Sequence, residues 1–204
     1  MRLLIITACL LFAASAFAQE SYFDKSRIPV VNSQIQYALI DTAKNLSKAD
    51  IFSLVSQWAS NKVSQKANTI QLNDKDGGKL ITRVSIPSSH FITVGRQNIP
   101  INFTIQMILD FTCKDSKYRL IINNLSIEIP ATMAGNKLID RTVSSYDTLL
   151  SNFPTADEYK TKPKSEQQIY QHQSKYLNTM HTEVLSILTS VKEFIRKGNT
   201  VNEL

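Results

Sequence analysis

The chain has 204 residues, of which 43% are apolar and 20% are charged, with five glycines, six prolines and two cysteines. This composition excludes collagen-like, disulfide-rich and wholly disordered chains, and the length suits one domain with a sizeable core. The formal net charge of +6 would favour anionic partners, but a charge of this size is also typical of an ordinary soluble surface.

The first eighteen residues have the three parts of a secretory signal. A basic start, Met1-Arg2, is followed by an apolar run that ends in the small-x-small triplet Ala16-Phe17-Ala18. We therefore expect residues 1–18 to be a signal peptide, and the protein to be exported to the periplasm or secreted. The alternatives are an uncleaved membrane anchor and a lipoprotein carrying its lipid on Cys9. After cleavage we expect no stable membrane span.

The rest of the chain divides into three parts. Residues 19–33 are polar with little periodicity and predict a flexible leader, and residues 198–204 predict a short tail. Residues 34–197 between them predict a single domain, within which residues 131–164 are irregular. The mature chain keeps one cysteine, Cys113, so its stability has to come from core burial rather than from an internal disulfide.

The first half of the domain predicts a strand, a helix and two more strands. A two-residue period indicates the first strand over 34–41, and Ser47 followed by Asp50 resembles a capping box before an apolar helical stripe. Turn-forming residues 74–78 separate the next two strands. We expect Pro87 to end the second of these because it cannot donate to a ladder, and residues 88–98 to form a loop.

The clearest signal is the alternation from Ile99 to Cys113, in which every odd position is apolar and the even positions are mostly polar. Such a pattern indicates a long antiparallel strand with one dry face and one wet face. We expect Lys114 to Lys117 to form a turn before another strand, in which the apolar parity changes at Asn123-Asn124. That change predicts a β-bulge or the exit of the strand from the sheet.

The last part of the domain predicts one long helix. Within residues 131–164 we expect at most a short helix around residues 139–150, whereas residues 165–168 resemble a second capping box. An apolar stripe then runs to Ile195, and Gly198-Asn199 is typical of a helix end. The fold class is therefore α+β in two layers: a five-stranded antiparallel sheet with two helices on one face, in the order β-α-β-β-β-β-α.

Three stretches of the sequence resemble a known family. They are Trp58 late in the first helix, the hairpin Asp76-Gly77-Gly78-Lys79-Leu80-Ile81, and Lys114-Asp115-x-Lys117-Tyr118-Arg119. Together they resemble domain of unknown function 4468, over roughly residues 34–130. The resemblance implies an exported bacterial protein with a fold like that of the TATA-box-binding protein (TBP), and it implies no activity and no catalytic residues.

Reactive constellations are scarce in this sequence. His172 and His181 lie nine residues apart, on opposite sides of the predicted helix, so they cannot share a metal. We place His90 in a loop and expect all three histidines to be surface or capping residues. The parity of Cys113 predicts a small buried apolar group rather than a nucleophile. We expect neither a metal site nor a cofactor.

The wet face of the predicted sheet is the candidate site. Parity places polar and charged side chains there, and two arginines with a carboxylate and an amide can grip an anionic or sugar-like ligand through paired hydrogen bonds. An ordinary solvated sheet with cross-strand ion pairs explains the same residues. Residues 131–164 would abolish such a site if they folded over this face. The candidate ligand-binding residues are Arg83, Gln106, Asp110 and Arg119.

Two functions of different classes remain open. The first is an exported, non-catalytic module of the bacterial envelope that binds or scaffolds an envelope protein or a glycan. The alternative is a hydrolase-type or ligand-processing enzyme using Asp110 with Arg83 or Arg119, which requires these groups to converge in a pocket. We do not expect nucleic-acid binding, because the chain is exported and the wet face lacks phenylalanine wedges.

Overall fold

The computed structural model describes residues 23–63, 69–94, 97–134, 137–139 and 141–201. The expected signal peptide and the first residues of the expected leader lie outside this part. The helices are η1 (Lys25–Arg27), α2 (Lys48–Val63), α3 (Tyr146–Ser151), α4 (Ala156–Thr161) and α5 (Lys164–Val201). The strands are β1 (Val30–Val31), β2 (Gln34–Ile35), β3 (Tyr37–Thr42), β4 (Thr69–Asp74), β5 (Lys79–Val94), β6 (Gln97–Lys114), β7 (Lys117–Ile129), β8 (Thr132–Ala134), β9 (Lys137–Ile139) and β10 (Thr142–Ser145).

The described strands build one six-stranded antiparallel sheet and two small two-stranded ones, β1 with β2 and β8 with β9. In the large sheet the order is β10-β7-β6-β5-β4, and β3 also pairs with β7. One edge of β7 is shared, because β3 pairs with residues 117–122 and β10 with residues 126–129. The expected α+β class is thus confirmed. The sheet gains a strand because residues 142–145, expected to be irregular, add β10 to its edge.

Alternation along β6 separates a buried face from a partly exposed one, as its sequence predicted. From residue 103 to residue 113 every odd side chain is buried, and the even side chains between them are half-buried. Burial of this row supplies much of the core, because each aliphatic or aromatic side chain removed from water contributes about 1.5–3 kcal/mol. The buried residues of the row are Phe103, Ile105, Met107, Leu109, Phe111 and Cys113.

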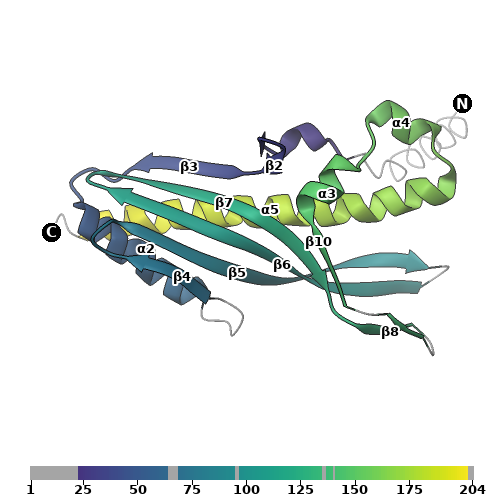
Figure 1. Ribbon diagram of the computed structural model, residues 1–204, viewed down its shortest axis with the longest axis horizontal. Helices are drawn as coiled ribbons and strands as arrows, with labels where there is room; N and C mark the ends of the chain where they lie inside the picture. Colours follow the sequence, from purple (N-terminus) through teal and green to yellow (C-terminus); the bar gives the residue numbers. More distant parts are fainter. Residues whose placement is uncertain (1–22, 64–68, 95–96, 135–136, 140, 202–204) are drawn as a thin grey trace, which may run out of the picture.

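Helices α2 and α5 cover the buried face of the sheet. In Figure 1 the strands lie in front of α5, which runs along the length of the molecule. The expected capping box holds the start of α2, where the Asp50 amide donates to Ser47 Oγ at 3.2 Å and the Ser47 amide donates to the Asp50 carboxylate at 3.2 Å. Trp58 joins the layers: its ring packs 5.9 Å from that of Phe111, and its Nε1 donates to Ser190 Oγ on α5 at 3.1 Å.

The change of apolar parity predicted near Asn123-Asn124 comes from a β-bulge in β7. The register moves from Gln106↔Ser126 to Ile108↔Asn123, so β7 holds one more residue than β6 over this stretch. Asn124, within the extra segment, has a φ of 50°, a left-handed conformation that asparagine tolerates better than most residues. The bulge lets residues on both sides of it keep their apolar side chains in the core.

Pro87 does not end its strand, contrary to the sequence prediction. β5 continues through Pro87 and pairs with β6 as far as Val94↔Gln97, so the expected loop over residues 88–98 is largely a hairpin. Strand β4 pairs with β5 only up to Arg83, which leaves β5 at the edge of the sheet from there on. A proline is tolerated at an edge because its missing N–H removes no bond to a neighbouring strand.

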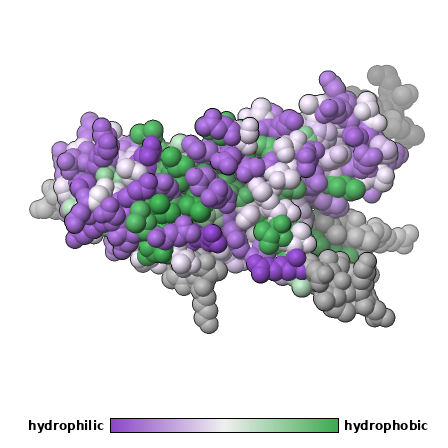
Figure 2. Space-filling model, in the orientation of Figure 1, coloured by the Kyte–Doolittle hydropathy of each residue, from purple (hydrophilic) through white to green (hydrophobic). Residues whose placement is uncertain are grey.

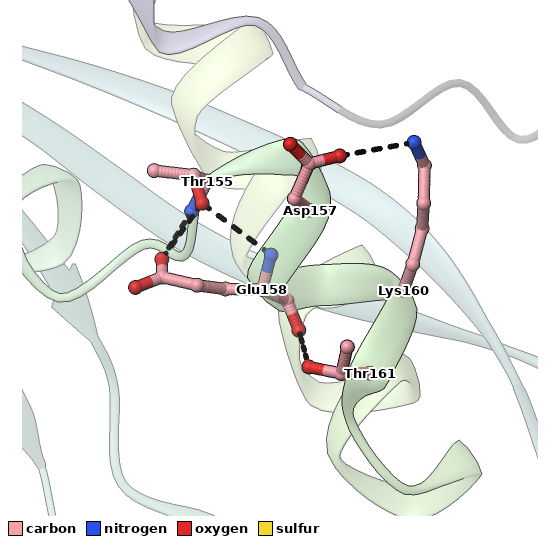
Figure 3. A network of polar contacts seen from close by, with 5 residues as sticks. All are labelled: Thr155, Asp157, Glu158, Lys160 and Thr161. Atoms are coloured by element: carbon pink, nitrogen blue, oxygen red, sulfur yellow. Dashed lines mark hydrogen bonds and ion pairs between the residues drawn. The ribbon is translucent and has the colours of Figure 1, made fainter.

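The expected irregular segment, residues 131–164, is mostly structured: β10 joins the edge of the sheet, and α3 packs on the helix side. Its buried side chains Tyr146, Leu150 and Phe153 join the main core, and the Phe153 ring packs 5.9 Å from that of Tyr170 on α5. Figure 3 shows the capping box of α4, where the Thr155 amide donates to the Glu158 carboxylate at 2.7 Å. The described helices of the segment therefore do not cover the candidate site, since they lie in the other layer.

Both ends of α5 differ from the sequence prediction. The helix begins at Lys164, so Ser165 lies inside the first turn, and the Gln167 amide donates instead to the Pro163 carbonyl at 3.0 Å. At the other end the helix continues through Gly198 to Val201. A Cβ on Gly198 would lie 2.4 Å from Leu54 Cδ2 of α2. The absence of a side chain there permits a close approach of two helices and does not mark a helix end.

Candidate functional site

The face of the sheet turned away from α2 and α5, called the outer face below, carries the predicted site residues. Exposure alternates along β7 and β5 as it does along β6, which confirms the parity on which the prediction rests. The register then shows which side chains of different strands are neighbours. The outer face includes Ala38, Ile40, Lys79, Ile81, Arg83, Gln106, Ile108, Asp110, Thr112, Lys114, Lys117, Arg119 and Ile121.

Three of the four predicted residues lie in neighbouring rows of this face. Asp110 pairs with Ile81 across the ladder, Arg83 with Ile108, and Arg119 with Thr112, so each arginine is a diagonal neighbour of Asp110. Neither arginine forms an ion pair with Asp110, however. Lys79 Nζ lies 3.4 Å from Asp110 Oδ2, while Arg119 Nη2 donates to Thr112 Oγ1 at 3.5 Å. Asp110 Oδ1 is buried without a hydrogen-bond partner.

The fourth residue, Gln106, belongs to a separate network nearer the β10 edge. Its Nε2 donates to Glu128 Oε2 at 2.7 Å, and Arg141 Nε lies 2.8 Å from Glu128 Oε1. Bonds to an ionised carboxylate are stronger than neutral ones, so this network fixes Gln106 in place. The four predicted residues therefore share a face but do not converge on one cluster.

Aliphatic side chains run across the outer face between the charged ones. Ile40 on β3 is 73% exposed, and Leu72 on β4 is 40% exposed. The row Ala38–Ile121–Asp110–Ile81–Leu72 crosses five strands in register. Figure 2 shows apolar side chains gathered on this side of the molecule, surrounded by hydrophilic ones. We call the following residues the aliphatic stripe: Ile40, Leu72, Ile81, Ile108 and Ile121.

A depression of about 220 Å³ opens at the end of the outer face nearest the β6–β7 turn. Of the predicted residues only Arg119 lines it; Arg83, Gln106 and Asp110 do not. The depression lies over β3, β6 and β7, so its walls are parts of the regular sheet rather than of a loop. Its lining residues are Ile40, Thr112, Lys114, Lys117, Tyr118 and Arg119.

The histidines and the cysteine are structural in their surroundings. His181 is buried, which contradicts the expected surface position, and its Nδ1 lies 2.7 Å from the Tyr37 hydroxyl. His90 lies in β5 rather than in a loop and packs 4.5 Å from the Tyr176 ring. Burial raises the pKa of the Cys113 thiol to about 11, so the thiol stays protonated and unreactive near neutral pH.

The described residues hold neither a group of metal ligands nor a membrane-spanning helix. No group of three or more histidine, cysteine, aspartate or glutamate side chains there is arranged to hold a metal ion. Within the same part of the chain, none of the helices is both long enough and apolar enough to cross a membrane.

Sequence reasoning missed Lys114 and Lys117 as site residues because it assigned them to the turn. The turn is in fact Asp115-Ser116, with a φ of 59° at Ser116, and the two lysines belong to the strands. Extending the parity of Thr112 and Arg119 by two residues towards the turn would have placed both lysines on the outer face. The parity of β5 also places Lys79 on this face, but its ion pair with Asp110 depends on the register of β5 and β6.

An antiparallel sheet with two helices packed on one face, and its other face uncovered by any described helix, defines the class of fold. Residues 37–128 match the model of a family described as a domain of unknown function (DUF4468) with TBP-like fold. The resemblance seen in the sequence is thereby confirmed.

Two solved structures are similar to this chain. A crystal structure of a DUF4468 family protein from Bacteroides ovatus ATCC 8483 is similar with a TM-score of 0.55 and 12% identity, covering 82% of this chain and 92% of that one. A TBP-like protein from Parabacteroides distasonis ATCC 8503 has a TM-score of 0.46 and 14% identity, over 80% of this chain and 97% of that one. A search of curated proteins finds no match.

Proposed function

We propose that this chain is an exported, non-catalytic module of the bacterial envelope that docks a protein partner on the outer face of its sheet. The observation that carries the proposal is that five aliphatic side chains gather on the outer face, two of them exposed (Ile40 and Leu72) and the other three half-buried. Contiguous exposed apolar surface, rimmed by polar residues, is typical of interaction sites. Ile40, at 73% exposed, has the most to gain from a covering partner.

The charges around the aliphatic stripe also suit a docking surface. Cationic side chains surround the stripe, and protein interfaces commonly combine an apolar centre with a polar rim. Such a rim attracts an acidic partner before contact and so raises the association rate. The cations of the rim are Lys79, Arg83, Lys114, Lys117 and Arg119.

Export is supported by the sequence of residues 1–18. The enzyme alternative has no observation in its favour, because Asp110 pairs with Lys79 and lies outside the depression. A glycan partner is a weaker candidate than a protein, since the centre of the face is aliphatic and offers few fixed hydrogen-bonding groups.

Photo-crosslinking in living cells of the native host tests the proposal. The full chain carries p-benzoyl-phenylalanine in place of Ile121, at the centre of the stripe, and a second version carries it in place of Leu185, exposed on α5. We expect a discrete protein adduct from position 121 and none from position 185. Fractionation of the same cells should recover the protein and its adduct with the envelope fraction.

A further substitution shows whether the adduct depends on the surface. Ile40→Asp puts a carboxylate diagonally across from the crosslinking position and opposite Arg119, without touching the buried face, and it should remove the adduct while the protein stays folded. A polysaccharide adduct would show that the partner is a glycan and not a protein. Equal adducts from both positions, or none from either, would overturn the proposal.

A further inference from the structure

The depression at the β6–β7 turn concentrates positive charge without a compensating carboxylate. Lys114 and Lys117 are directly opposite each other in the register of β6 and β7, and their side chains lie on the same face. Like charges placed directly opposite across two strands repel each other and destabilise the pair. Arg119 follows two residues along on this face. Among the described residues, none of these three cations takes part in an ion pair.

The scaffold holds these cations close together. The turn residue Ser116 donates its amide to the Leu46 carbonyl at 2.9 Å, and its carbonyl accepts from the Ala43 amide at 2.9 Å. Asp115 accepts from the Lys48 amide at the start of α2 at 2.8 Å. The turn is therefore tied to the core on both sides, and the backbone positions of the two lysines are fixed before any ligand binds.

One wall of the depression is apolar. Ile40 lines it opposite Arg119 in the register of β3 and β7, and Ile121 lies two residues further along β7 on the same face. A ligand whose charge lies among the cations would thus lay its adjoining atoms on aliphatic side chains. Each CH₂ group that this contact removes from water would strengthen binding.

From this placement we propose that the depression is a subsite for a carboxylate or phosphate group carried on an aliphatic segment. The anion removes the repulsion between Lys114 and Lys117 and accepts a hydrogen bond from Arg119, and the segment runs from Ile40 towards Ile121. This inference deepens the proposed function, because the subsite would hold an acidic group of whatever docks on the outer face.

Titrations of the ¹⁵N-labelled mature protein with small anions, followed by nuclear magnetic resonance, test the subsite. The probes are acetate, inorganic phosphate and octanoate below its micelle concentration, at constant ionic strength with chloride as the reference. We expect saturable shifts at the amides of residues 40, 112 and 117–121, with octanoate binding at least tenfold more tightly than acetate. The phosphate arm shows which anionic group the cations prefer.

Two charge-reversal variants separate the site from general electrostatics. Lys114→Glu should abolish saturable binding and yet raise the urea midpoint of unfolding, because it replaces a like-charge pair by an opposite one. Lys164→Glu makes the same charge change in α5, at the far end of the molecule (Figure 1), and should leave binding unchanged. A gain in stability with a loss of binding cannot come from misfolding.

The proposal is overturned if the shifts are uniform over the surface, fail to saturate, or survive Lys114→Glu. It is also overturned if octanoate binds no better than acetate, since the aliphatic wall would then contribute nothing. Either failure leaves the crosslinking result at position 121 untouched, so the docking face and this subsite stand or fall separately.

Discussion

The surroundings of His181 disfavour its charged form. It is buried on α5, its Nδ1 lies 2.7 Å from the Tyr37 hydroxyl, and the two rings are 5.7 Å apart. Burial lowers the pKa of His181 below its usual 6.5, and the nearby positive charge of Arg27 lowers it further. Burial also lowers the pKa of His90, and the nearby charges of Lys175 and His172 lower it further.

These shifts predict a loss of stability on mild acidification. Above pH 6.5 both folded and unfolded chains keep the two imidazoles neutral. As the pH falls below 6.5 the unfolded chain takes up protons first, so the free energy of unfolding decreases until the pH passes the lowered folded pKa values. Urea unfolding at pH 8 and pH 5.5 should therefore give a lower midpoint at the acidic value.

The histidines can be separated from the carboxylates in this experiment. Asp24, Asp50 and Glu158 also have lowered pKa values, but their ordinary values of 3.8 to 4.5 place the stability that they contribute at lower pH. His181→Gln should reduce the difference between pH 8 and pH 5.5, and adding His90→Gln should reduce it further. An undiminished difference in the double variant would show that other groups cause it.

At the scale of helices and strands, the sequence predicted the features that depend only on residues close together in the chain. The alternation in β6, the capping box at Ser47 and the bulge near Asn124 are local, so they were predicted correctly. Pro87 and Gly198 were misassigned because their roles depend on distant segments: the missing neighbour of β5, and Leu54 on α2. For the same reason parity placed the candidate residues on one face but gave neither their partners nor the depression.

Residues 146–161 show how a segment without a clear pattern becomes ordered. Phe153 is buried between Phe23 and Tyr170, with ring centroids 5.9 Å away on each side, and its carbonyl accepts from Lys25 Nζ at 3.2 Å. One aromatic side chain thus connects the start of the described chain, this segment and α5. Docking depends on tertiary contacts more than on the propensity of the two short helices.

Phe153→Ala should release this segment without unfolding the sheet. Removing a buried phenylalanine costs about 3–5 kcal/mol, and a unit held mainly by that side chain opens locally before the whole domain does. Hydrogen exchange should therefore lose protection by at least about a hundredfold over residues 146–161, while β6 and β7 keep theirs.

Ile169→Ala is the matched control for this change, because Ile169 lies on the facing helix but is exposed. It should alter exchange in neither region. Equal loss of protection in the segment and in the sheet after Phe153→Ala would mean that the domain opens only as one unit.

For the molecule as a whole, the two faces of the sheet differ in burial: one packs against the helices and the other is partly exposed to water. The inner face, together with α2 and α5, holds the fold, and the outer face keeps aliphatic side chains in partial contact with water. Adjacent residues of β7 belong to opposite faces: Ile122 is buried against Tyr37 and Leu109, its neighbours in the register, and Ile121 lies on the outer face. A stability measurement on this pair therefore tests the division directly.

Replacing isoleucine by threonine keeps the branch at Cβ but exchanges the ethyl group of the side chain for a hydroxyl. Ile122→Thr should lower the free energy of unfolding by about 2–4 kcal/mol, because the core loses apolar contact and gains a hydroxyl without a partner. Ile121→Thr should lower it by less than about 1 kcal/mol, since water still reaches that side of the strand. Urea unfolding at pH 8 measures both.

The same two variants distinguish folding from docking. Ile121→Thr should weaken the crosslink formed from another outer-face position, such as position 81, although the protein is nearly as stable as the parent chain. Ile122→Thr should weaken the crosslink only in proportion to the fraction of unfolded protein. If Ile121→Thr instead costs as much stability as Ile122→Thr, the stripe is part of the core and the outer face is not held open for a partner.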